Sequence, residues 1–117
     1  MHGFILVYGN DEMLVATRSL VLEKSGYTVF TAESVSNAML VLMNHEIDLL
    51  VLCQSVDEYE RRSILETART LQPKVKCVSL SLGGNDNAMD GVYARQWSMN
   101  PPALLAAIGQ ILQEKTA

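Results

Sequence analysis

The sequence predicts an α/β fold, in which a parallel β-sheet carries helices on both faces. Five short apolar runs alternate with longer segments of helical period along the 117 residues. Runs that are apolar at nearly every position suit strands that are buried on both sides. Because strands separated by helices form parallel sheets with right-handed crossovers, few topologies remain. The strand order 2-1-3-4-5 is the common one at this size.

The opening apolar run and the polar residues after it predict the first strand and the first helix. Residues 4–8 form the strand, and Asn10 can cap a helix whose first turn holds Asp11 and Glu12. Gly26 fits the end of this helix. Spacings of three and four predict a face made of Met13, Leu14, Ala16, Thr17, Leu20, Val21 and Lys24.

A second strand over 27–31 and a third over 47–52 enclose the second helix. Ser34 or Ser36 caps this helix. Its apolar positions are Ala38, Met39, Leu42 and Met43. Methionine fills irregular gaps between other side chains, so we expect the six methionines to lie mainly in the core.

The second half of the chain continues the alternation. Ser55 and Glu58 have the spacing of a capping box, which predicts a third helix that ends near Leu71. The remaining elements are a strand over 75–82, a short helix over 87–91, a strand over 92–99 and a last helix opened by Pro101-Pro102. The whole set predicts one flavodoxin-like three-layer sandwich over residues 1–117. Such a domain either stands alone or belongs to a longer protein.

Charge and composition exclude several classes of protein. The net charge is −4 and no cluster of basic residues is present, which argues against direct binding to nucleic acid. Neither a signal peptide nor an apolar run near the roughly 20 residues that span a bilayer is found. The stagger of Cys53 and Cys77 on neighbouring strands argues against a disulfide. We therefore expect a cytoplasmic protein that binds neither nucleic acid nor membranes.

Four stretches of the chain share the order and spacing of one known family. They are Phe4-Ile5-Leu6-Val7, residues 26–32 followed by Ala38-Met39, Asp48 to Leu52, and Met99-Asn100-Pro101. Over almost its whole length the sequence resembles the receiver domain of two-component response regulators. The resemblance implies a flavodoxin-like fold and a role in signal transduction or a phosphorelay.

The same resemblance implies which positions would carry phosphotransfer. In the family, two acids after the first strand and an acceptor aspartate hold Mg²⁺, while a hydroxyl and a lysine contact the phosphoryl group. The acidic pair falls on Gly9 and Asn10, or on Asn10 and Asp11 if the loop is shifted by one. The acceptor, hydroxyl and lysine positions are Cys53, Ser81 and Asn100.

These departures predict that phosphotransfer is lost. Thiolate is a poor ligand for Mg²⁺, and at best one carboxylate, that of Asp11, remains of the acidic pair. Asp48 precedes its strand, and Asp57 lies in the first turn of a helix, where a capping role is expected. We therefore expect no Mg²⁺ site, no aspartyl phosphate, no enzyme activity and no cofactor.

Cys53 at the acceptor position and Trp97 each allow two interpretations. Cys53 could be a reactive thiol at the mouth of the sheet, or a small buried substitute that packs as a hydrophobe. No Lys or Arg is evident beside it, which favours packing. Trp97 matches the aromatic position whose ring moves in switching receivers, and it could equally be an ordinary packing residue.

The sequence therefore indicates a pseudo-receiver that works by protein–protein interaction. The surface over residues 87–115 corresponds to the one through which the family docks partners. A histidine kinase, an output domain or another regulator would be the partner, and the same surface could form a homodimer. The alternatives are a receiver that responds to oxidation of Cys53, a small flavodoxin-like cofactor carrier, and ordinary phosphorylation at a misaligned site.

Overall fold

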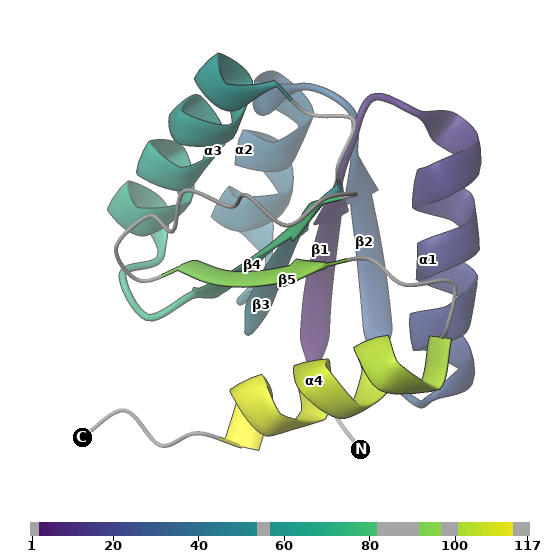
Figure 1. Cartoon of the computed structure of the whole chain (residues 1–117). Coiled ribbons are helices and arrows are strands. Elements are labelled where there is room, and N and C mark those ends of the chain that lie inside the picture. The colour runs from purple at the N-terminus through teal and green to yellow at the C-terminus, as the bar shows by residue number, and fades with distance from the viewer. Residues whose placement is uncertain (1–2, 54–56, 82–91, 97–100, 114–117) are drawn as a thin grey trace.

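Helices cover both faces of one parallel β-sheet in the computed structural model of the chain (Figure 1). The structure describes residues 3–53, 57–81, 92–96 and 101–113. In chain order the elements are β1 Phe4–Tyr8, α1 Glu12–Lys24, β2 Thr28–Ala32, α2 Val35–Asn44, β3 Leu49–Leu52, α3 Glu58–Leu71, β4 Lys76–Ser81, β5 Val92–Gln96 and α4 Pro101–Gln113. The strands pair in parallel in the order β2-β1-β3-β4-β5. The predicted fold class and strand order are confirmed.

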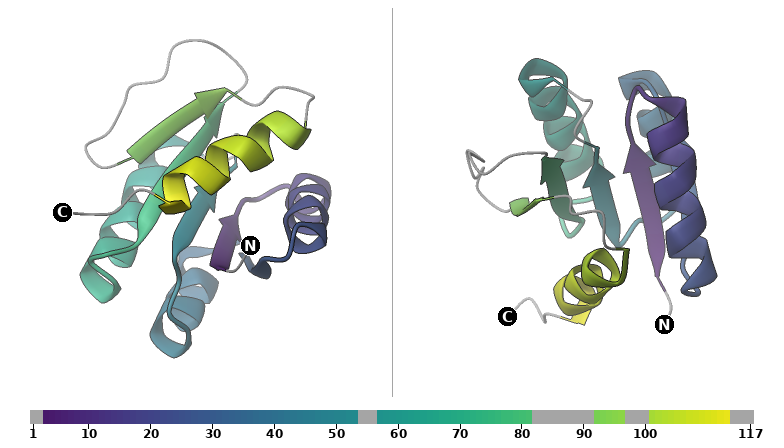
Figure 2. Two further views of the ribbon diagram at one scale, coloured as in Figure 1. Left: turned by 90° about the horizontal axis from the view of Figure 1, so that it is seen from below. Right: turned by 45° about the vertical axis from the view of Figure 1, so that its right-hand side comes forward.

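The sheet separates two apolar cores, because successive residues of a strand point to opposite faces. The core under α2 and α3 contains Leu6, Leu50, Leu52, Ala38, Leu42, Ile64, Leu65 and Ala68. The core under α1 and α4 contains Ile5, Val7, Leu49, Val51, Leu22, Ile108 and Ile111. Figure 2 shows the helices around the sheet from two further directions. The strands β1 and β3 are buried on both faces and lie inside the sheet. Their carboxyl ends therefore lie side by side at one edge of the sheet.

Two of the predicted helix caps are wrong by one or two residues. Asp11, not Asn10, is the N-cap of α1, and its Oδ1 accepts from the backbone N–H groups of Met13 and Leu14 at 3.0 and 3.3 Å. A carboxylate suits the positive end of the helix dipole better than an amide does. Asp57, not Ser55, caps α3 by accepting from the N–H of Glu60 at 2.8 Å. This contact confirms the capping role expected for Asp57. Of the two serines proposed for α2, Ser34 is the cap.

The buried face of α1 differs from the predicted one. The helix turns Arg18, Ser19 and Leu22 towards the sheet, while the side chains of Met13 and Leu20 are 79% and 55% exposed. Apolar residues occur on almost every side of this helix, so their spacing does not select one face. Packing of α1 against the sheet, including β2, determines which face of the helix is buried.

The expectation that methionines fill the core is also wrong where the structure describes them. Met13, Met39 and Met43 are exposed, although the latter two share α2 with the buried Ala38 and Leu42. Small or branched side chains occupy the buried stripe of α2, and the flexible thioethers are left outside it.

Three strands begin later than predicted, because side chains or turns capture their first residues; the third of them, β4, starts at Lys76 because the N–H of Val75 donates to the carbonyl of Gln72 at 3.0 Å. The backbone N–H of Tyr27 donates to the carbonyl of Leu22 and closes the end of α1, so β2 starts at Thr28. Ile47 donates to the side chain of Gln72 at 2.7 Å, and β3 starts at Leu49. The helix predicted over 87–91 and the end of the strand predicted over 92–99 lie outside the described residues.

None of the helices in the described part of the chain is long and apolar enough to cross a membrane.

Candidate functional site

The carboxyl ends of β1 and β3 bring the predicted site residues together. Tyr8 and Leu52 are paired at the ends of these strands, so Gly9 and Cys53 follow side by side. The N–H of Cys53 donates to the carbonyl of Tyr8 at 3.0 Å, and the N–H of Gly9 donates to the carbonyl of Ala32 at 3.1 Å. This edge is where open α/β sheets place their ligands and chemistry.

Cys53 fills the space that a side chain at position 9 would need. Its side chain is 0% exposed. A Cβ atom built on Gly9 would lie 3.0 Å from Cβ of Cys53, 3.0 Å from Cγ2 of Val15 and 3.3 Å from Sγ of Cys53. Contacts this short are tighter than most between carbon atoms, so a side chain at position 9 would be accommodated only if its neighbours shifted by a few tenths of an ångström. A carboxylate at position 9 would require Cys53 or Val15 to move.

The surroundings of Cys53 keep its thiol neutral at ordinary pH. Burial raises the pKa of Cys53 to about 11, the charge of Arg18 lowers it, and the charge of Asp11 raises it again. Burial outweighs Arg18, since the resulting pKa still lies above the ordinary value of 9.0. The nucleophilic thiolate is therefore scarce at this position.

Arg18 corrects the expectation that no cation lies beside Cys53. The residue comes from the sheet-facing side of α1, is 1% exposed, and its Nη1 donates to the carbonyl of Leu14 at 3.4 Å. Burial lowers the pKa of Arg18. Sequence reasoning missed it because a charged residue on an amphipathic helix is expected to face water.

The polar residues of the loop after β1 are engaged with their own chain. The carboxylate of Asp11 caps α1. In the amide orientation that satisfies its neighbours, Asn10 donates from Nδ2 to Oε2 of Glu60 at 3.1 Å and to the carbonyl of Glu33 at 3.2 Å. Through these contacts the loop connects α1, the residue Glu33 before α2, and Glu60 of α3.

A buried tyrosine completes the same network. The hydroxyl of Tyr8 donates to Oε2 of Glu60 at 2.5 Å, the oxygen that Asn10 also contacts. The pKa of Tyr8 is raised by burial first, then by the hydrogen bond to Glu60 and by the charges of Glu60 and Asp57. The sequence interpretation did not include this pair. A tyrosine at the end of a buried strand needs a partner for its hydroxyl, which is the signal that could have suggested one.

The other predicted positions lie apart from this cluster or outside the described residues. Ser81 is the last residue of β4, and only its backbone is described. Asn100 and Trp97 lie outside the described residues, as do residues 87–91 and 114–115 of the segment 87–115. Asp48 lies at the opposite edge of the sheet, where its Oδ2 accepts from the N–H of Phe4 at 2.9 Å.

The described residues at the carboxyl edge do not fit Mg²⁺. The ion requires several oxygen ligands in octahedral geometry. Gly9 offers no side chain, Cys53 offers a neutral thiol, and Oδ1 of Asp11 is used in the helix cap, so this carboxylate alone supplies too few ligands. Within the described part of the chain no three His, Cys, Asp or Glu side chains are grouped as ligands for a metal.

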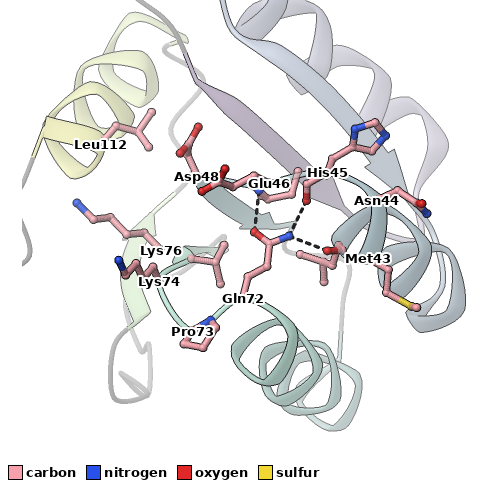
Figure 3. Close-up of a pocket in the computed structure, with 13 residues that line it drawn as sticks. Met43, Asn44, His45, Glu46, Asp48, Gln72, Pro73, Lys74, Lys76 and Leu112 are labelled. Atoms are coloured by element: carbon pink, nitrogen blue, oxygen red, sulfur yellow. Dashed lines mark hydrogen bonds between the residues drawn. The ribbon is translucent and has the colours of Figure 1, made fainter.

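A hollow of about 770 Å³ lies at the opposite, amino-terminal edge of the sheet (Figure 3). Gln72 caps the end of α3 and joins this helix to the connection between α2 and β3. Its Oε1 accepts from the N–H of Ile47 at 2.7 Å, and its Nε2 donates to the carbonyls of Leu42 and His45 at 2.8 and 2.6 Å. The side-chain amide of Gln72 is therefore fully used in holding this connection.

Two charged side chains of the same hollow also support the fold. Nζ of Lys76 donates to the carbonyl of Ile111 at 2.7 Å and ties β4 to α4. Asp48 binds the N–H of Phe4 and so ties the start of β3 to β1. We interpret this hollow as structural, because its polar groups serve the backbone and because parallel sheets bind ligands at the other edge.

Comparison with known proteins identifies the class of fold. No known family model matches the sequence, and no curated protein matches it. The fold, however, is that of response-regulator receiver domains of the CheY-like type. The chain is similar to a receiver domain from Methanospirillum hungatei, with 21% identity, coverage of 96% of this chain and 94% of that one, and a TM-score of 0.77.

Two further structures are similar in the same way. The receiver domain of the hybrid histidine kinase CckA has 20% identity, coverage of 95% of this chain and 100% of that one, and a TM-score of 0.79. A response regulator from Burkholderia pseudomallei that contains a phosphorylated aspartic acid, a calcium ion and citrate has 20% identity and a TM-score of 0.72. That match covers 90% of this chain and 65% of the other.

Both cysteines are expected to react slowly with thiol reagents in the folded protein. The thiols are free and buried, and burial raises the pKa of Cys53 and of Cys77 to about 11. A pKa near 11 in place of 9.0 lowers the thiolate fraction at pH 8 on the order of 100-fold. Labelling with a maleimide at pH 8, followed by mass spectrometry, should therefore lag behind free cysteine by at least this factor. Denaturation in urea should restore the free rate, whereas fast labelling of Cys53 in the folded protein would favour the redox-responsive alternative.

Proposed function

We propose that the protein is a degenerate receiver domain that acts in signal transduction by binding other proteins and does not accept a phosphoryl group. Its receiver-domain fold supports a place among response regulators. In this proposal the domain is a binding module rather than an enzyme, holds no cofactor and acts in the cytoplasm.

The state of Cys53 is the observation that carries the proposal. A phosphoryl acceptor must be an exposed nucleophile with its charge available for attack. Cys53 is 0% exposed, packs against Gly9, and has a pKa raised to about 11. Asn10 carries an amide and Asp11 caps α1 through Oδ1, which supports the proposal that neither residue replaces the missing acceptor.

The surface over residues 87–115 is the proposed docking site for partners. Of this surface, the structure describes the backbone of β5 and the helix α4, which packs on the sheet through Ile108 and Ile111. A histidine kinase, an output domain or another regulator would bind there, and a homodimer through the same surface is compatible with it. Since no phosphoryl group would shift the conformation, the partner itself must favour one state by binding it more tightly.

Incubation with acetyl phosphate and Mg²⁺ is the test of this function. We expect the intact mass to stay unchanged, because the acceptor position holds the buried, neutral thiol of Cys53 and the carboxylates of Asp11 and Asp57 cap helices. The fluorescence of Trp97 should likewise stay flat on titration with Mg²⁺ and a fluoride complex that mimics a phosphoryl group.

The response regulator from Burkholderia pseudomallei is a suitable positive control, since its structure contains a phosphorylated aspartic acid. A mass gain of one phosphate on this chain, while that control also gains one, would overturn the proposal. Mapping the modified residue would then show which position replaces Cys53 as acceptor.

A further inference from the structure

The outer surface of α2 is apolar, although this helix lies at the surface of the molecule. Met39, Leu40 and Met43 are 40%, 60% and 64% exposed. The buried stripe of the helix holds the smaller Ala38 together with Leu42. An amphipathic surface helix has the opposite arrangement, with its polar side chains outside. In the described part of one chain, the larger apolar side chains of α2 are therefore left in contact with water.

The helix α2 also lacks charged residues. Over Val35–Asn44 it contains apolar residues, one serine and two asparagines. A helix that is apolar on every side is typical of a buried position. Burial against another molecule would also explain why flexible methionines, which adapt to irregular surfaces, occupy the outside of this helix.

The apolar surface continues from α2 onto the neighbouring helix α3. The two helices lie side by side on the same face of the sheet (Figure 1). A groove of about 450 Å³ lies between them and is lined by Met39, Glu66, Thr67, Thr70 and Leu71. Leu71 is itself 39% exposed. We call the surface formed by Met39, Leu40, Met43 and Leu71 the α2–α3 patch.

We propose that the α2–α3 patch binds the same patch of a second copy of the chain in a two-fold dimer. A two-fold interface brings each surface against its own copy, so that surface must be self-complementary. The exposed side of α2 meets this requirement, because its apolar side chains gain from mutual burial and no like charges come together. With the axis running across the helices, the two helix pairs pack face to face in opposite directions, as neighbouring helices do in bundles.

The charges at the rim of the patch suit the same arrangement. Glu66 and Arg69 are exposed residues of α3 and have opposite charges. When α3 of one copy runs antiparallel to α3 of the other, Glu66 of each copy approaches Arg69 of its counterpart. Complementary charges of this kind select the partner and the register of an interface.

Other occupants fit the patch less well. A helix that lies on a membrane carries lysine or arginine beside its apolar side, and α2 has neither. A strongly charged peptide would find no complementary charge on α2. The proposed dimer does not depend on the receiver-like role, and it uses a surface separate from residues 87–115.

The size of the patch predicts a reversible dimer. Two neighbouring helices make a surface about 20 Å wide and roughly 15–20 Å long, which covers on the order of 300–400 Å² per copy. A stable interface of standard size buries roughly 800 Å² per partner, so we expect a dissociation constant of about 10–500 µM. Sedimentation equilibrium between about 5 µM and 1 mM should show monomer converting to dimer, with concentration-dependent amide shifts in residues 35–44 and 66–71. A protein that stays monomeric up to about 1 mM would refute the dimer.

Paired charge variants test the two-fold contact itself. Leu40→Glu/Met43→Glu and Leu40→Lys/Met43→Lys each place like charges near the axis, so either variant alone should weaken dimerisation at least about tenfold. An equal mixture of the two should dimerise to within about threefold of the original protein, because opposite charges then meet across the axis. Failure of the mixture to recover would show that the patch does not meet its own copy.

The matched control is Met13→Glu/Leu20→Glu on α1. It changes the same two residue types, which are 79% and 55% exposed, and should leave dimerisation within about twofold of the original. Urea unfolding checks that all variants fold, as expected for exposed positions. Equal weakening by the control would contradict the proposal. A dimer that persists in both α2 variants, with amide shifts in 92–96 and 101–113, would overturn it in favour of residues 87–115 and leave the proposed function unaffected.

Discussion

Replacing Gln72 with alanine is expected to lower the free energy of unfolding by roughly 2–4 kcal/mol. The change removes three hydrogen bonds at once and leaves the N–H of Ile47 and the carbonyls of Leu42 and His45 without this partner. Each buried group that loses its partner costs about 1–3 kcal/mol, and the lower part of that range applies because Gln72 is only half-buried. Urea unfolding followed by circular dichroism measures the difference.

Two further variants test whether the hydrogen bonds of Gln72, rather than its size, stabilise the connection between α2 and β3. Gln72→Glu keeps the acceptor for Ile47 but turns a carboxylate towards two carbonyl oxygens, so we expect it to be at least as destabilising as alanine. Gln110→Ala changes an exposed glutamine on α4 and should stay within about 0.5 kcal/mol of the original protein. A Gln72→Ala variant as stable as Gln110→Ala would contradict the structural role assigned to the amino-terminal hollow in Figure 3.

The topology could be predicted because local pattern and long-range packing agree over most of the sheet. The continuous apolar runs that became β1 and β3 are buried on both faces, as such runs require. Agreement failed at α1, where apolar residues face all directions and the buried side carries Arg18 and Ser19. No spacing rule would place a guanidinium under a sheet, so only the tertiary structure could reveal that face.

The candidate site was predictable in position and not in its contacts. Strand ends in a parallel sheet meet at one edge, and the resemblance to receiver domains assigned Cys53 and either Gly9 and Asn10 or Asn10 and Asp11 to that edge. The bond from Tyr8 to Glu60 joins residues 52 positions apart, and no local pattern encodes such a pair. The effect of Arg18 on Cys53 escaped prediction for the same reason, since it depends on which side of α1 faces the sheet.

Placing an aspartate at position 53 is expected to destabilise the protein by about 3 kcal/mol relative to Cys53→Asn at pH 7. The two replacements have nearly the same shape and differ in charge. Cys53 itself indicates what an anion meets there, because its pKa is raised from 9.0 to about 11 even though Arg18 attracts the thiolate. A shift of two pKa units corresponds to roughly 3 kcal/mol against the charged form, and a carboxylate in the same surroundings should meet a penalty of similar size.

The pH dependence of these two variants separates charge from packing. Burial would raise the pKa of the new aspartate in the folded state, so its penalty is present at pH 7 and disappears as the pH falls towards about 4, near the value in the unfolded chain. Urea unfolding of Cys53→Asp and Cys53→Asn should therefore give different stabilities at pH 7 and similar ones at pH 4. Equal stabilities at pH 7 would mean that Arg18 pairs with the carboxylate, and the site would then accept the charge that a phosphoryl acceptor needs. A difference at pH 7 that disappears at pH 4 would mean that restoring the acceptor residue alone cannot restore phosphotransfer, because the buried position of Cys53 disfavours the charge.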